Sequence, residues 1–230
     1  MPVIVFSSPK GGCGKTTAAT LLATELAHKG ASVAVIDADP NRNVADWAKL
    51  PGAPEGLTVI SDVTEETIVD QIEAASAKAA FVIVDLEGTA NLLVSYAISF
   101  ADFVVIPMQG SQLDARQAGR QIKLIRAQER VVGHAIPFAV LFTRTSPAIM
   151  PRTQRHIEGR FAESEIPVLE TRLCDREAYR AMFSYGGTLE TLDSKNVSNI
   201  EVAIRNARAF AGEVVERLRQ AKSGEVARVA

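Results

Sequence analysis

Residues 8–17 read Ser8-Pro9-Lys10-Gly11-Gly12-Cys13-Gly14-Lys15-Thr16-Thr17. They follow an apolar run at residues 3–6 and precede an amphipathic pattern at 15–29, which predicts a strand, a glycine-rich loop and a helix in that order. Glycines in such a loop let backbone N–H groups converge on phosphate oxygens, and the helix N-terminus adds partial positive charge. The stretch therefore predicts a phosphate-binding loop.

Individual side chains of this loop have distinct expected roles. Lys15 should reach the β and γ phosphates of a nucleotide, and the Thr16 hydroxyl should bind Mg²⁺. The strict phosphate-loop pattern has glycine at position 9, where this chain has proline, whereas the variant with an extra lysine fits at Lys10. The alternative is a turn that binds nothing, in which these glycines, lysines and threonines stand in order by chance. We expect ATP with Mg²⁺, contacted by Lys10, Gly11, Gly12, Cys13, Gly14, Lys15, Thr16 and Thr17.

Short apolar runs rich in Val and Ile recur between amphipathic stretches. Runs that are apolar on both faces are typical of strands covered by helices on two sides. The predicted strands are residues 3–6, 33–36, 57–60, 81–84, 103–106 and 137–142, and the predicted helices are 15–29, 65–78, 111–131 and 151–163. This alternation predicts an α/β fold with a doubly wound, mostly parallel sheet flanked by helices. Ligands bind such sheets at the carboxyl ends of the strands.

Composition limits the class of protein further. The 230 residues suit one α/β domain, predicted here at 1–223 with a frayed tail at 224–230. With 25 basic and 27 acidic residues the formal charge is -2, which excludes nucleic-acid binding by bulk charge and leaves only a local patch. Two cysteines make no disulfide framework, and the N-terminus lacks the basic region of a signal peptide. We expect a soluble, cytoplasmic protein that does not enter a membrane.

Carboxylates follow two of the predicted strands. Asp37 and Asp39 are one residue apart at the end of the second strand, so both side chains leave it on the same face. Asp85 ends the apolar run 81–84, a pattern that delivers one carboxylate to a magnesium ion, usually through water. The alternatives are a turn built by Asp37 to Pro40 and an ordinary strand end at Asp85.

The run Lys10 to Thr17 resembles the deviant Walker A motif of the ParA and MinD superfamily. This resemblance implies an ATP-bound homodimer in which Lys10 reaches the nucleotide of the partner subunit. It also implies that Asp39 orients the attacking water and that Asp37 sits near the magnesium ion. Lys10, Lys15 and Asp39 are thus the expected catalytic residues, and Thr16, Asp37 and Asp85 are the expected metal site. Residues 85–88 would form the loop that senses the γ phosphate.

Two later stretches resemble members of this superfamily. Residues 106–114 are similar to a segment of short plasmid partition ATPases and VirC1-like proteins, although Ser111 and Asp114 are also sufficient as a cap for the next helix. Thr143 and Arg144 stand where the family places an adenine contact, which is often asparagine. The loop 171–176 is expected to close over the base.

The last predicted helix, residues 194–222 with Ser194 or Asn196 as its cap, has a candidate DNA-binding stripe. Its members Arg205, Arg208, Arg219 and Lys222 fall on about a third of the helix circumference. The alternative is a solvated helix face, since Glu201 and Glu216 point in nearly the same direction. ParA ATPases bind DNA without sequence preference when ATP dimerises them, so the resemblance favours the DNA interpretation.

Together these features favour a partition ATPase that binds DNA non-specifically as an ATP-bound dimer, associates with the nucleoid, and is reset by a small ParB-like or adaptor protein. The second hypothesis is a VirC1-like or other ParA-like factor that recruits or positions a protein or conjugation cargo. A membrane switch like MinD is disfavoured because residues 223–230 lack a bulky apolar face. A metabolic enzyme such as dethiobiotin synthetase should carry substrate residues in place of Lys10.

Overall fold

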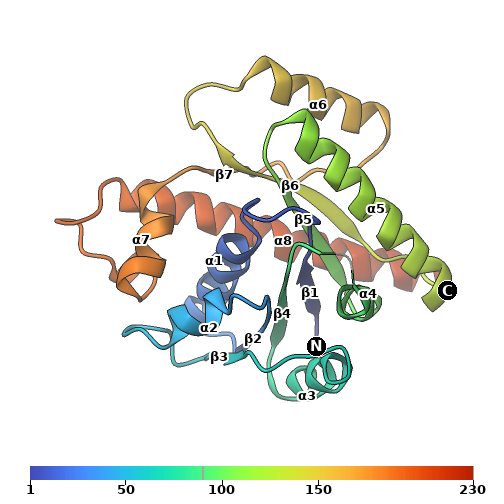
Figure 1. The fold of residues 1–230 in the computed structure, drawn as a ribbon, viewed down its shortest axis with the longest axis horizontal. Coiled ribbons are helices and arrows are strands. Elements are labelled where there is room, and N and C mark those ends of the chain that lie inside the picture. Colours follow the sequence, from blue (N-terminus) through green and yellow to red (C-terminus); the bar gives the residue numbers. More distant parts are fainter. Residues whose placement is uncertain (90, 230) are drawn as a thin grey trace.

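The computed structural model describes residues 1–89 and 91–229, with side chains described at 1–89 and 91–223. Seven parallel strands form one sheet in the order β3-β2-β4-β1-β5-β6-β7 (Figure 1). The strands are β1 Val3–Phe6, β2 Val33–Ala38, β3 Leu57–Ile60, β4 Phe81–Leu86, β5 Phe103–Met108, β6 Phe138–Thr145 and β7 Leu173–Cys174. The predicted fold class is confirmed, and the tail predicted at 224–230 falls outside the described side chains.

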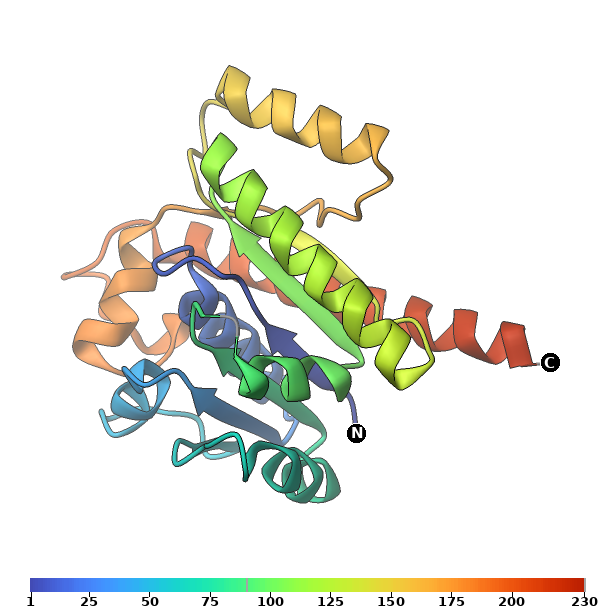
Figure 2. The same cartoon turned by 45° about the vertical axis from the view of Figure 1, so that its right-hand side comes forward.

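Helices cover both faces of this sheet (Figures 1 and 2). The helices are α1 Lys15–His28, α2 Asn43–Ala48, α3 Ile68–Lys78, α4 Leu92–Ser99, α5 Gln112–Val132, α6 Arg152–Glu163, α7 Glu177–Tyr185 and α8 Ile200–Val229. Side chains alternate along β1, so Ile4 and Phe6 join the core under α1, α7 and α8, while Val3 and Val5 join the core under α3, α4, α5 and α6. Both faces are apolar because helices bury both.

Local chemistry sets the ends of the helices. α1 begins directly after Gly14, whose φ of 93° lies in the left-handed region open to glycine. At α5 the Ser111 hydroxyl accepts from the Asp114 N–H at 3.1 Å, and Gly133 ends the helix with φ 80°. Ser111 thus caps α5, as the capping interpretation of Ser111 and Asp114 predicted.

The last helix begins later than the sequence predicts. α8 starts at Ile200, so neither Ser194 nor Asn196 caps it. Asp193 explains the difference, because its carbonyl accepts from the N–H groups of Asn196 and Val197 and its carboxylate accepts from the Lys195 N–H. These bonds close a separate turn ahead of the helix.

Trp47 joins α2 to the chain before α8. Its ring is 2% exposed, and its Nε1 donates to the Gly187 carbonyl at 3.0 Å. Gly186 and Gly187 both have φ values in the left-handed region, and a side chain at Gly186 would meet the Pro51 carbonyl at 2.7 Å. The glycine pair therefore lets this turn approach α2 closely.

Candidate active site

The glycine-rich loop lies at the centre of the sheet, where β1 ends between β4 and β5. The Thr143 hydroxyl, from the end of β6, contacts the carbonyl oxygens of Cys13 at 2.6 Å and Met108 at 3.1 Å. Gln109 Nε2 donates to the Gly12 carbonyl at 3.2 Å. Two strand ends thus hold the carbonyl side of the loop, which leaves its N–H side available for an anion.

Lys15 is buried beneath this loop. Its Nζ donates to the carbonyl oxygens of Lys10 at 3.2 Å and Ser8 at 3.4 Å. The ammonium group therefore lies against the carbonyl oxygens of the loop, from where it can exchange these weak contacts for phosphate oxygens.

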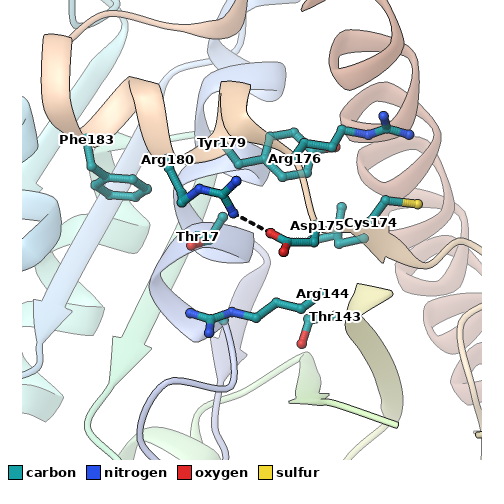
Figure 3. Close-up of a pocket in the computed structure, with 11 residues that line it drawn as sticks. Thr17, Thr143, Arg144, Cys174, Asp175, Arg176, Tyr179, Arg180 and Phe183 are labelled. Carbon is teal, nitrogen blue, oxygen red and sulfur yellow. Dashed lines mark hydrogen bonds and ion pairs between the residues drawn. The ribbon is translucent and has the colours of Figure 1, made fainter. Parts of the chain in front are cut away.

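Two adjoining cavities open beside the loop. The first, about 350 Å³, is lined by the loop glycines, Lys15, Thr16, Asp39 and Glu87, and the second, about 300 Å³, is lined by Leu173, Cys174, Arg176, Tyr179 and Phe183. Gly14, Thr17 and Arg144 line both cavities. Figure 3 shows the second cavity, with the α7 side chains on one side and Thr143 and Arg144 on the other. A polyphosphate fits the first space, and a flat ring fits the second.

Asp85 is fully buried near the end of β4, beside Thr16, which lines the first cavity. Neither of its carboxylate oxygens accepts a well-aligned hydrogen bond from the described residues, and the Thr16 hydroxyl lies beside them. Burial raises the pKa of Asp85 to about 7, while the Thr16 hydroxyl and the charge of Lys15 lower it. A buried carboxylate without such bonds fits a cation, so Asp85 and the Thr16 hydroxyl suit Mg²⁺. The described residues contain no cluster of three His, Cys, Asp or Glu side chains that could hold a metal ion.

Asp37 has a structural role that the sequence did not reveal. It stands beside Asp85 across the β2–β4 pairing, and its Oδ2 accepts from the N–H groups of Val44 and Ala45, both at 2.9 Å. Burial raises the pKa of Asp37, and these backbone bonds oppose the rise. Asp37 therefore anchors the first turn of α2.

Asp39 lies on the wall of the first cavity. Its Oδ1 accepts from the Asn41 N–H at 2.9 Å and from Asn41 Nδ2 at 2.8 Å, which closes a turn at Asp39 to Arg42, slightly later in the chain than the Asp37 to Pro40 turn offered as the alternative to catalysis. The bonds leave its Oδ2 available to the cavity. Turn formation and water orientation are thus compatible at this residue.

Lys10 forms an ion pair within its own chain. Its Nζ lies 2.7 Å from Oδ1 of Asp114, whose side chain is 2% exposed and also bonds the Ser111 hydroxyl. Lys10 itself is 40% exposed. Asp114 is thus the intramolecular partner of Lys10, which sequence spacing could not show because the two residues meet only through the packing of α5.

Thr143 and Arg144, the two residues expected to contact the base, point in different directions. Thr143 turns its hydroxyl to backbone carbonyls, as described above, whereas Arg144 projects into the space between the two cavities from a left-handed backbone with φ 50°. The loop 171–176 lines the second cavity and is held by α8, where Asn206 accepts from the Cys174 N–H at 3.1 Å and donates to the Arg172 carbonyl at 2.8 Å. Asn206 was missed because nothing in its own helix pattern distinguishes it.

The loop after β4 touches the glycine-rich loop. A side chain at Gly88 would lie 3.0 Å from the Gly11 nitrogen, so only glycine allows this approach without a shift. Glu87, one residue earlier, accepts from Asn91 Nδ2 at 2.6 Å, and Asn91 caps α4. The Glu87–Asn91 bond thus links the segment beside the phosphate loop to the first turn of α4.

The four basic residues of the predicted DNA stripe all lie on α8. Arg208 is 3.6 Å from Glu25 and 3.3 Å from Glu190. Arg219 is 3.9 Å from Glu216. Lys222 is 3.7 Å from Asp102. Only Arg205 has no carboxylate of the described residues within ion-pair distance, so α8 presents less unpaired positive charge than its sequence suggests.

No helix among the described residues has the length and apolarity needed to span a bilayer.

Comparison with known proteins gives the family. The model of the family described as VirC1 protein matches residues 1–221. The chain is 44% identical over 221 residues to Protein ParA of Rhizobium radiobacter, covering 96% of this chain and 99% of that one, and 28% identical to Protein virC1 of Rhizobium rhizogenes, covering 94% and 95%. A plasmid partition protein from Borrelia burgdorferi bound to AMPPNP has the same fold, with a TM-score of 0.70 at 16% identity over 94% of this chain and 99% of that one. The chain belongs to the VirC1 protein family.

Proposed function

We propose that this protein is a Mg²⁺-dependent ATPase. The observation that carries the proposal is a preformed phosphate loop beside a buried carboxylate, Asp85, whose oxygens accept no well-aligned hydrogen bond from the described residues. Lys15 and the loop N–H groups bind the phosphates, and the base enters the second cavity. Mg²⁺, when bound to Thr16 and the phosphates, would supply charge stabilisation at the reacting phosphoryl group. Asp39 orients the water, which its placement on the cavity wall supports.

Phosphate release and ATP calorimetry test this proposal. Lys15→Ala removes the cation that lies beneath the phosphate loop. Losing two charge-assisted contacts between Lys15 and the phosphates, each of about 1.5–3 kcal/mol, should lower the ATP affinity at least about 100-fold. Lys49→Ala removes an exposed lysine far along the chain from the loop and should leave affinity unchanged. Wild-type affinity in the Lys15 variant would show that the nucleotide site lies elsewhere.

We further propose that the ATPase cycle positions DNA cargo, as in partition proteins. The support is the similarity over nearly the full length to a protein named ParA and the likeness in fold to a plasmid partition protein. ATP binding joins two copies, with Lys10 crossing to the partner's nucleotide, and a small ParB-like or adaptor protein stimulates hydrolysis. The test is ATP-dependent dimerisation by light scattering together with retention of a plasmid that carries the gene.

The match to the VirC1 family model favours a second candidate, the recruitment or positioning of a protein or conjugation cargo. The two functions share the ATPase and differ in the partner. Plasmid loss in a deletion strain supports partition, whereas normal retention with failed DNA transfer supports recruitment.

A further inference from the structure

The outward face of α5 carries a row of basic residues. Its members are Arg116, Arg120, Lys123 and Arg130, which we call the α5 row; all four are exposed. At 3.6 residues per turn they fall within about 80° of the helix circumference. The buried side chains of α5 point the opposite way, so the row faces solvent. Helix α5 itself runs along the outside of the sheet (Figures 1 and 2).

The charge of the α5 row is not neutralised within the chain. Among the described residues no carboxylate lies within ion-pair distance of any of its four members. α5 itself holds two acidic residues, and both are engaged: Asp114 with Lys10, and Glu129 with Arg126. This is the reverse of α8, where three of the four predicted DNA contacts have carboxylate partners.

A neighbouring helix adds to this positive surface. α6 packs beside α5, and its exposed Arg152 and Arg155 also lack a carboxylate partner among the described residues. The acidic side chains of α6 are Glu158, held by Arg172, and Glu163 at its C-terminal end, near Arg160. The start of α6, where Gln154 packs on Gly110 just ahead of α5, therefore adds unpaired positive charge beside the start of α5 on a protein whose net charge is -2.

We propose that the α5 row binds the phosphate backbone of duplex DNA. From Arg116 to Arg130 the row spans about 21 Å at 1.5 Å per residue. Duplex DNA carries one negative charge per about 1.7 Å of axis, so a phosphate lies near each of these cations whatever the base sequence. A membrane surface fits less well: the exposed apolar side chains beside the row are Leu113 and Val131, which stand at its two ends and do not form the continuous apolar face that a helix lying in a membrane surface needs.

The position of the row also connects it to the nucleotide. Arg116 follows Asp114 by two residues, and Asp114 holds Lys10 beside the phosphate loop. If two copies join through this end of the molecule, as the proposed function requires, the rows of the two subunits come together and contact more phosphates than one row can. The ATP dependence of DNA binding rests on that proposed function, whereas the location of the binding surface does not.

Two charge-matched triple variants test the inference. Arg116→Glu/Arg120→Glu/Lys123→Glu reverses three of the four charges of the α5 row, and Arg205→Glu/Arg219→Glu/Lys222→Glu makes the same charge change on α8. Fluorescence anisotropy with a labelled random-sequence duplex, Mg²⁺ and a slowly hydrolysed ATP analogue gives the affinity at several salt concentrations. The α5 variant should bind at least about tenfold more weakly, and its salt slope should flatten by about 3 per subunit, since each lost phosphate contact contributes about 0.9.

The α8 variant should bind within about threefold of the wild-type affinity, a difference of less than 1 kcal/mol. Arg116→Lys/Arg120→Lys should bind as the wild type does, because a phosphate contact needs charge more than shape. Loss of binding in the α8 variant with retention in the α5 variant would overturn the inference, as would wild-type protein that binds anionic phospholipid vesicles and no duplex. Light scattering on the same samples separates the two proposals: DNA binding that depends on the α5 row without ATP-dependent dimerisation supports the inference and contradicts the proposed dimer.

Discussion

At the scale of single residues, the ion pair between Lys10 and Asp114 sets a condition on dimer formation. Before Lys10 can reach another subunit, it must break its ion pair with Asp114, whose Oδ1 lies 2.7 Å from the lysine Nζ. An ion pair that is half exposed on one side contributes on the order of 1 kcal/mol, so its loss should be measurable without dominating the binding energy.

Asp114→Asn should therefore strengthen the ATP-dependent dimer. Removing about 1 kcal/mol of competing interaction corresponds to about a fivefold lower dissociation constant for each lysine released. Sedimentation or light scattering over a protein dilution series with an ATP analogue measures it. Glu129→Gln, on the same helix, is the matched control, and Asp114→Asn should have no effect in a Lys10→Ala background. A weaker dimer in Asp114→Asn would mean that the carboxylate positions Lys10 for its partner instead of retaining it.

At the scale of elements, the packing of α1 against α8 buries an unusual carboxyl group. Glu25 on α1 is 2% exposed and lies near Glu190 and Arg208. Burial and the adjacent Glu190 raise the pKa of Glu25 from 4.5 to about 7, while Arg208 lowers it. The folded protein thus keeps a proton on Glu25 where the unfolded chain has lost it, so its contribution to stability is present below about pH 4.5 and is lost as the pH rises to 7.

Glu25→Gln should remove this pH dependence. Above pH 7 the variant should be more stable than the wild type by about 1 kcal/mol, which is about 2–4 °C in Tm for a chain of this size. The difference should shrink steadily between pH 7 and pH 5. Thermal unfolding at several pH values measures it, with Glu201→Gln at the exposed start of α8 as a control that should show no trend. A variant less stable than the wild type at pH 8 would show that the Arg208 contact outweighs the cost of burial.

Elements with strong local patterns were predictable from the sequence. The six predicted strands and the helices α1, α3, α5 and α6 occur where their apolar periodicity placed them, within a few residues at their ends. Short elements such as α2 and β7 were not, because they depend on contacts between distant segments: Asp37 anchors α2, and Asn206 holds the loop that contains β7. Asp114 as partner of Lys10 was hidden for the same reason. The phosphate loop was predictable because its chemistry is contained in consecutive residues.

At the scale of the whole molecule, the central position of β1 joins ligand binding to global stability. β1 pairs with both β4 and β5. The loop after β1 lies against Gly88, which follows β4, and is bonded by Gln109, which follows β5, and by Thr143 near the end of β6. A ligand held there stabilises the folded state by the free energy of binding, about 2.7 kcal/mol at a concentration 100 times its dissociation constant.

ATP with Mg²⁺ should therefore raise Tm by about 5–10 °C at that saturation. In Asp85→Asn the nucleotide-free protein should unfold at a higher temperature than the wild type, because an uncharged amide costs less to bury than an unpaired carboxylate. The same variant should lose the part of the ATP effect that depends on Mg²⁺. Differential scanning calorimetry with ATP in the presence of Mg²⁺ or EDTA distinguishes these effects, and an unchanged Mg²⁺ increment in the variant would exclude Asp85 from the metal site.

The single tryptophan gives this chain a built-in optical probe. Trp47 is buried, and its indole N–H donates to the Gly187 carbonyl. Its helix, α2, is anchored at its first turn by Asp37, which stands beside Asp85 across the β2–β4 pairing. Indole emission shifts to longer wavelength when the ring meets water and responds to changes in its hydrogen bond. Excitation near 295 nm therefore isolates one location, a helix away from the phosphates, so stopped-flow mixing with unlabelled ATP can follow movement of α2 without any dye attached to the protein.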